Sequence, residues 1–124
     1  MYLEELFKDS PHKCSLFSKE AIQKIESDIY TKNVKGKDVP YMQCQVRHKE
    51  IKVTPEEAVR QLYIYTLVHT YGYSVEQMEL ERQIHFGREV KRADIVIFEK
   101  SHPNVEYIII ELKKPKRQSE WIFP

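Results

Sequence analysis

Two apolar segments rich in Ile and Val, at 92–98 and 105–113, constrain the fold of this chain more than any other feature. Segments of this length and composition predict β-strands, and the turn-prone residues 101–104 between them predict a loop. Pro115 ends the second segment, since proline has no N–H for a strand partner. The chain must therefore bury a sheet, and 41% hydrophobic residues in a length of 124 are enough for one folded domain.

A helix start at 54–57 is the clearest local pattern before these strands. Thr54 can accept a hydrogen bond from the first turn, and Pro55 suits the first helical position because its missing N–H would be unpaired there. Glu57 completes a capping box. The helix is expected to continue to about residue 71 and to end at Gly72, and its broad apolar face indicates packing against a sheet.

Shorter elements are predicted on both sides of this helix. We expect one domain overall, with an N-terminal helix and short strands over 1–53 and the functional core over 54–124. The further elements expected are a helix at 20–30 capped by Ser18, strands at 41–46 and 50–53 in a hairpin about 47–49, and a strand at 79–86 before a turn at Gly87.

Charge and targeting patterns limit the class of protein. The 20 basic and 19 acidic residues give a net charge of +1, which excludes a histone-like cationic surface. Residues 88–117 carry eight basic and five acidic groups, so the basic surplus gathers there. No apolar run is long enough to span a membrane and no signal peptide is recognisable, which favours a cytoplasmic protein. Cys14 and Cys44 are expected to be free thiols, and none of the five dispersed histidines is assigned a catalytic role.

The strands at 92–98 and 105–113 carry charged residues that point to chemistry. Because strand side chains alternate, Glu111 and Lys113 share one face with Ile109. If the strand bearing Asp94 lies beside this one, three charged groups converge at one end of the sheet. Two carboxylates and an ammonium group suit a hard divalent cation and an attacking water.

Hydrolysis of a phosphodiester needs these residue types. Asp94 and Glu111 would bind Mg²⁺, with Mn²⁺ as a substitute, because Mg²⁺ prefers one or two carboxylates, waters and phosphate oxygens. Lys113 would position or help deprotonate the water and balance the charge that develops on the phosphoryl group. A solvent-facing Glu–Lys pair at a strand end remains the alternative.

Five motifs between about residues 50 and 117 carry a family resemblance. An apolar strand with Asp followed by Glu-x-Lys resembles the PD-(D/E)xK nuclease superfamily, and the five together resemble the N-terminal nuclease domain of type I restriction enzyme R (motor) subunits. They are Thr-Pro-Glu-Glu-Ala-Val-Arg-Gln at 54–61, Tyr-Gly-Tyr at 71–73, Phe-Gly-Arg at 86–88, Lys-Arg-Ala-Asp-Ile-Val at 91–96 and Ile-Ile-Glu-Leu-Lys-Lys-Pro at 109–115.

This resemblance implies a fold, an activity and a site. The fold is α/β, a restriction-endonuclease-like core with a mixed central sheet flanked by helices, and the activity is Mg²⁺-dependent cleavage of DNA. Asp94 and Glu111 match the metal-binding carboxylates and Lys113 the catalytic lysine. A glutamate of the leading helix is expected at the same site. Glu57 is preferred to Glu56, although Glu57 also has the capping role.

The resemblance also implies partners. Double-stranded DNA is the expected substrate, and the full-length protein is expected to act in the cytoplasm with specificity and modification subunits and a helicase motor in defence against foreign DNA. ATP use is not predicted for this chain, which lacks a Gly-x-x-x-x-Gly-Lys loop. Phosphate contacts and an ordinary solvated surface are equally open for the basic residues expected to bind DNA, which are Lys91, Arg92, Lys114, Lys116 and Arg117.

The sequence departs from the family pattern after Pro115. A Gln-x-x-x-Tyr element is expected there, and Gln118 is followed at the fourth position by Ile122. We therefore expect the chain to be a C-terminally incomplete fragment, or its apolar tail at 118–124 to be covered by a partner or by a second copy in a homo-oligomer. The alternative function is a catalytically silent nuclease-fold module that binds DNA or a protein.

Overall fold

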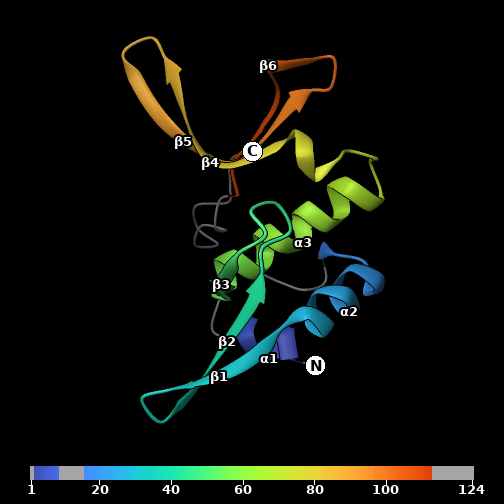
Figure 1. Cartoon of the computed structure of the whole chain (residues 1–124), viewed down its shortest axis with the longest axis vertical. Helices are drawn as coiled ribbons and strands as arrows, with labels where there is room; N and C mark the ends of the chain where they lie inside the picture. The colour runs from blue at the N-terminus through green and yellow to red at the C-terminus, as the bar shows by residue number, and fades with distance from the viewer. Residues whose placement is uncertain (1, 9–15, 113–124) are drawn as a thin grey trace, which may run out of the picture.

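The computed structural model describes residues 2–8 and 16–112 (Figure 1). Its elements in chain order are α1 (Tyr2–Phe7), α2 (Lys19–Asp28), β1 (Tyr30–Val34), β2 (Lys37–Gln43), β3 (Glu50–Lys52), α3 (Pro55–His69), the 3₁₀ helix η2 (Val75–Gln77), β4 (Met78–Phe86), β5 (Glu89–Glu99) and β6 (His102–Ile110). Within these residues, no helix combines the length and the apolar character that a membrane span needs.

In the part of the chain that the structure describes, the strands form two separate three-stranded sheets, in the orders β1-β2-β3 and β4-β5-β6. All four strand pairs in these sheets are antiparallel. The combination of helices and strands confirms the predicted α/β class, whereas the described residues form two antiparallel sheets in place of one mixed central sheet. The difference arises because short turns join consecutive strands, and a short turn allows only antiparallel pairing.

Helix α3 lies between the two sheets and is buried on two sides (Figure 1). One side, which includes Leu62, packs with residues of α1, α2 and β2. The other, with Ile64, packs against β4, β5 and β6. Both side chains are fully buried, and each contributes about 1.5–3 kcal/mol through burial. The broad apolar face expected for this helix is therefore explained by two cores rather than one.

The predicted starts of α2 and α3 are confirmed by the hydrogen bonds of their capping residues, although the helices end at Asp28 and His69, before the predicted residues 30 and 71. The Ser18 hydroxyl accepts from the Ala21 N–H at the start of α2. The Thr54 hydroxyl accepts from the Glu57 N–H at 3.1 Å. Gly72 follows α3 with a φ of 80°, which glycine adopts without a steric penalty.

Several strand boundaries differ from those predicted. The helix expected at 20–30 ends at Asp28, and Tyr30 begins β1, a strand that was missed. A two-residue turn with positive φ at Lys35 and Gly36 joins β1 to β2. Strand β6 starts at His102 rather than 105, because Lys100 and Ser101 alone form the turn, and it ends at Ile110 rather than Lys113.

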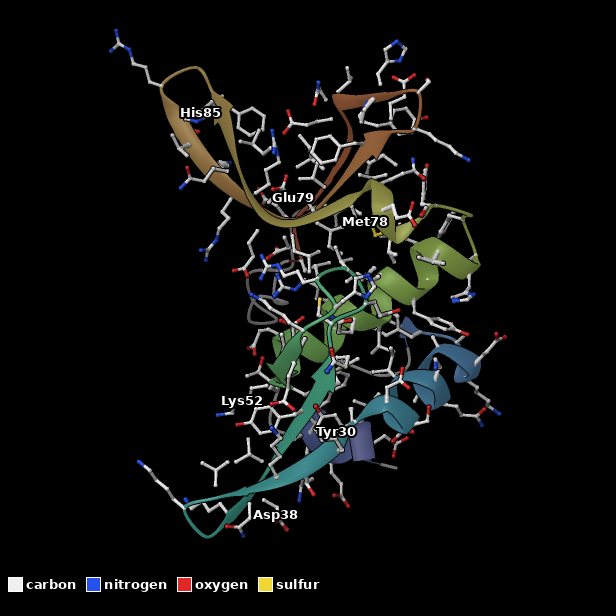
Figure 2. All side chains as sticks on the ribbon, viewed as in Figure 1. Tyr30, Asp38, Lys52, Met78, Glu79 and His85 are labelled. Atoms are coloured by element: carbon white, nitrogen blue, oxygen red, sulfur yellow. The ribbon has the colours of Figure 1, made fainter. Side chains whose placement is uncertain are left out.

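The side chains labelled in Figure 2 lie on the two sheets. Tyr30 and Lys52 lie on the lower sheet, and Asp38 lies towards its hairpin tip. Glu79 lies near the base of the β4–β5 hairpin, and His85 lies towards its tip.

Candidate functional site

Asp94 lies on β5 and is bonded to the chain that follows β6. Its Oδ2 accepts a hydrogen bond of 2.7 Å from the backbone N–H of Leu112. Ile95 pairs with Ile110 in the β5–β6 ladder, so this bond continues the pairing beyond the last ladder position. Glu111 lies between Ile110 and Leu112, which are both bonded to β5, and its side chain is exposed. The structure therefore brings Asp94 next to the chain segment that carries Glu111.

Alternation along β6 agrees with the sequence prediction. Ile108, Ile110 and Leu112 are partly buried against the core beside α3. Ile109 and Glu111 are exposed on the opposite side. Lys113, Lys114, Lys116 and Arg117, and the tail at 118–124, lie outside the described residues, as does Cys14. Cys44 is a buried free thiol, as predicted.

Glu57 lies in the first turn of α3 with its carboxylate sheltered from solvent. The Arg60 Nε donates to its Oε2 at 3.0 Å, and Arg60 Nη2 donates to its Oε1. The Gln61 side-chain amide also donates to Oε2 at 3.0 Å. Glu57 thus engages side chains one turn further along α3. Thr54 supplies the side-chain cap of the predicted capping box, accepting from the Glu57 backbone.

Glu57 and Asp94 share one cavity of about 240 Å³. The cavity lies where the first turns of α3 meet β4, β5 and the chain after β6. Two residues proposed from sequence therefore come together there, and Glu56, the alternative helix glutamate, also lines it but is exposed. The full lining comprises Thr54, Glu56, Glu57, Val59, Arg60, Glu81, Asp94 and Leu112.

Glu81 reaches this cavity through a break in the alternation of β4. Leu80 packs in the cluster against α3, and the next side chain, Glu81, also reaches Arg60 of α3. Arg82 turns to the opposite face, where its guanidinium lies 5.1 Å from the centre of the Phe98 ring. The cause is the backbone of Glu81, whose φ of 56° is in the left-handed region. Strict alternation, as predicted, cannot place Glu81 in this site.

The partner strand shows the same break opposite Glu81. Leu80 pairs with Ile95 and Arg82 with Ala93, so Glu81 lies opposite Asp94. Ala93 packs in the small cluster on the outer face of the sheet, whereas Asp94 lines the cavity. The irregularity in both strands therefore presents two carboxylates to α3 at one level of the sheet.

Three arginines from separate elements surround the Glu81 carboxylate. Arg47, in the turn between β2 and β3, lies 3.4 Å away and also donates to the Leu80 carbonyl at 3.0 Å. Arg60 lies 3.7 Å and Arg92 3.8 Å from Glu81. Arg92, predicted to contact DNA, has a largely exposed side chain. Lys91, beside it on β5, is exposed as well.

Gln61 is the fully buried polar residue that supports Glu57. Its side-chain oxygen accepts from the Gln45 backbone N–H at 3.2 Å and from the Gln45 side chain at 2.9 Å. Its amide donates to Glu57 and to the Cys44 sulfur. This network ties the β2–β3 turn to α3.

The charges around the cavity act on Arg60. Burial by itself lowers the pKa of the Arg60 guanidinium, because desolvation disfavours the charged form. The hydrogen bond to Glu57 and the charges of Glu57, Glu81 and Asp94 outweigh burial and raise that pKa above its ordinary value. Arg60 therefore remains cationic over the whole range of pH in which proteins fold.

The carboxylates that line this cavity are the type of ligand that a hard cation binds. Carboxylate oxygens from Glu57 and Asp94 are the ligands that Mg²⁺ takes, with waters and substrate phosphates completing its shell. Within residues 2–8 and 16–112, however, no three Asp, Glu, His or Cys side chains converge closely enough to hold an ion by themselves. A cation bound here would depend on oxygens from water or substrate, and it would meet the Arg60 guanidinium.

Comparison with known proteins identifies the family. No curated protein and no solved structure matches the chain. The family model described as "Type I restriction enzyme R protein N terminus" matches residues 55–121. That match covers 67 of the 124 residues, from the first residue of α3 past the end of β6, and contains Glu57, Asp94 and Glu111. The resemblance predicted from the motifs is thereby confirmed, and the chain belongs to the family of type I restriction enzyme R protein N-terminal domains.

Proposed function

We propose that this chain is a Mg²⁺-dependent DNA endonuclease domain of the type I restriction enzyme kind. The observation that carries the proposal is the shared cavity, in which Glu57 of α3 and Asp94 of β5 lie together beside the chain segment bearing Glu111. All three residues fall within the segment that matches the family. Carboxylates from different elements at one cavity suit the binding of a cation and a phosphate together.

Each residue has a distinct part in the proposed reaction. Asp94, Glu111 and Glu57 would hold Mg²⁺, or Mn²⁺ in its place. The bound ion supplies Lewis acidity and a water of lowered pKa. Lys113 would orient that water and stabilise negative charge on the phosphoryl group. The Leu112 N–H fixes the Asp94 carboxylate, so the chain itself orients one ligand before any ion arrives.

Basic residues of β5 and of the segment after Lys113 are proposed to bind the DNA backbone. Lys91 and Arg92 are exposed on β5, on the strand that carries Asp94. Lys114, Lys116 and Arg117 follow the proposed catalytic lysine in the sequence. Contacts of this kind hold a duplex without reading its sequence. Specificity and modification subunits and a helicase motor, in a cytoplasmic restriction complex, are the proposed partners of the full-length protein.

A catalytically silent nuclease-fold module that binds DNA is the second candidate. It is favoured by one observation, the pairing of Glu57 with Arg60, which neutralises a proposed metal ligand. Titration calorimetry with Mn²⁺ separates the candidates, because the endonuclease requires a cation site that Asp94→Ala removes. The silent module predicts DNA binding that weakens with salt and is unchanged by Asp94→Ala.

Cleavage of supercoiled plasmid tests the proposed activity. Wild type and Lys113→Ala are incubated with the plasmid in Mg²⁺ or Mn²⁺, and nicked and linear products are measured over time. The endonuclease predicts cleavage by the wild type and its loss in the variant. Equal nicking by both proteins rejects the assignment.

Sizing of the protein in solution tests the proposed homo-oligomer, which a monomer would exclude.

A further inference from the structure

Arg60 interacts with three carboxylates that line the cavity from three different elements. Its guanidinium donates to both oxygens of Glu57 on α3 and lies 3.7 Å from Glu81 on β4. The charge of Asp94 on β5 acts on it as well. A cation supplied by the chain therefore faces Glu57 and Asp94, two of the carboxylates that the proposed function assigns to a divalent ion.

The pair that Arg60 forms with Glu57 is sheltered from water. The exposed fraction of the Arg60 side chain is 14% and that of Glu57 is 11%. Two parallel N–H···O bonds between a guanidinium and a carboxylate are directional and strong. Arg60 donates to both Glu57 oxygens, and Oε2 also accepts a hydrogen bond from Gln61. The protein itself therefore engages the whole carboxylate of Glu57.

A divalent ion at Glu57 needs the oxygens that Arg60 binds. The guanidinium charge also repels such an ion at short range, and poor exposure leaves that repulsion weakly screened. The protein groups alone offer no set of three ligands within the described residues. Binding of an ion is therefore linked to a change in the position of Arg60.

Building on the proposed function, we propose that Arg60 is an internal counter-cation of this site and that a divalent cation binds Glu57 and Asp94 by displacing the Arg60 guanidinium from Glu57. In the metal-free protein, Arg60 neutralises these carboxylates and holds Glu57 in place. The apparent affinity for the ion is then reduced by the fraction of molecules in which Arg60 remains on Glu57.

Glu81 provides the internal comparison for this proposal. When Arg60 leaves, Glu81 keeps two other cationic neighbours, Arg47 at 3.4 Å and Arg92 at 3.8 Å. Within the described residues, the Glu57 carboxylate is bound by one cation, Arg60, and by the neutral side-chain amide of Gln61. Displacement of Arg60 thus frees Glu57 oxygens specifically. Removing Arg47 takes a cation from Glu81 and leaves the Arg60–Glu57 pair intact.

Calorimetric titration with Mn²⁺ tests the proposal. Wild type, Arg60→Gln and Arg47→Gln are titrated under identical conditions after treatment with chelator. Arg60→Gln is expected to bind Mn²⁺ about five- to tenfold more tightly than the wild type, a coupling typical of linked sites. The affinity of Arg47→Gln for Mn²⁺ is expected to lie within about twofold of the wild-type affinity. Equal or weaker binding by Arg60→Gln overturns the proposal, and so does equal tightening by both variants.

Thermal unfolding gives a second measurement that does not depend on DNA cleavage. In chelator, Arg60→Gln is expected to unfold at a lower temperature than the wild type, because Glu57 loses its buried cation. Mn²⁺ is expected to raise the midpoint of the variant more than that of the wild type. If Arg60→Gln does not fold in chelator, Arg60→Met, which keeps the apolar stem, is titrated in its place. A midpoint shift in either folded variant no larger than that of the wild type contradicts the proposal.

The outcomes separate this inference from the proposed function. Tighter Mn²⁺ binding by Arg60→Gln without DNA cleavage by any form supports the counter-cation and rejects the nuclease. DNA cleavage by the wild type with unchanged Mn²⁺ affinity in Arg60→Gln supports the nuclease and rejects the counter-cation. Absence of Mn²⁺ binding to both the wild type and Arg60→Gln rejects both.

Discussion

The backbone N–H of Leu112 donates a hydrogen bond of 2.7 Å to the side chain of Asp94. The bond joins β5 to the chain just past the end of β6, where ladder pairing has stopped at Ile110. It gives Asp94 a structural role in addition to its proposed chemical one, because the same carboxylate lines the cavity and fixes the neighbour of Glu111.

Substitution of Asp94 separates these two roles. Asp94→Asn keeps an oxygen that can accept from Leu112, so we expect its free energy of unfolding to fall by less than about 1 kcal/mol. Asp94→Ala leaves a partly buried N–H without its acceptor and is expected to cost about 1–3 kcal/mol. Urea denaturation of the two variants measures the difference. Equal losses in both would show that the Leu112 bond contributes nothing to stability.

Replacement of Glu81 tests the backbone conformation that brings it to the site. Glu81→Gly and Glu81→Ala both remove the carboxylate, but only glycine adopts a φ of 56° without a Cβ penalty. Glu81→Gly is therefore expected to be more stable than Glu81→Ala by about 0.5–1 kcal/mol.

The matched control is Gln83, an exposed residue two positions along β4. Its φ is not among the positive values, so Gln83→Gly is expected to be less stable than Gln83→Ala by about 0.5–1 kcal/mol. Chemical denaturation of the four variants measures both differences. The same sign at both positions would contradict the left-handed conformation of Glu81.

Loss of the Gln61 side chain should destabilise the fold. Gln61→Ala leaves the Gln45 N–H without its side-chain acceptor and opens a space in the core, at an expected cost of about 2–3 kcal/mol. Gln43→Ala, at an exposed position on β2, is expected to stay within about 0.5 kcal/mol of the wild type. Urea denaturation measures both, and similar small effects at the two positions would show that the Gln61 network is not stabilising.

At acid pH the β1-β2-β3 sheet is expected to lose stability, because Glu50 becomes protonated. The hydrogen bond from Lys32, followed by that from Tyr30, lowers the pKa of Glu50 below its ordinary value. A lowered pKa in the folded state adds stability above the unfolded pKa and loses it as pH falls through the folded pKa. The stability advantage of wild type over Glu50→Gln should therefore shrink between about pH 5 and about pH 3. Thermal midpoints of both proteins against pH measure it, and a constant difference would contradict the pairing.

Local chemistry made part of the fold predictable from sequence. Thr54 and Pro55 fix the start of α3 within a single turn, and alternation placed Glu111 on the same face of the strand as Ile109, where both are exposed. Strand β1 escaped prediction because all five of its residues are exposed, so no apolar alternation marks it. The two-sheet arrangement also escaped, since strand pairing depends on contacts distant in sequence.

Within the candidate site, only the residues that belong to the sequence motifs could be predicted. Glu57 and Asp94 belong to motifs and come together in the cavity. Glu81 was missed because alternation assumes extended backbone, and its left-handed φ follows from the tertiary structure. Arg60 was missed because an Arg three residues after a Glu on a helix usually indicates a surface ion pair. A charged pair on the buried side of a helix, next to Gln61, is the pattern that could have indicated it.

The most direct test of the account compares the rates at which wild type and Asp94→Asn cleave supercoiled plasmid in Mg²⁺. The variant keeps the acceptor for the Leu112 N–H and loses only the negative charge of Asp94. We expect cleavage by the wild type that stops in chelator, and a rate at least about 100-fold lower for Asp94→Asn. Equal rates for the two folded proteins, or no cleavage by the wild type, would contradict the assignment of this site as a metal-dependent nuclease centre.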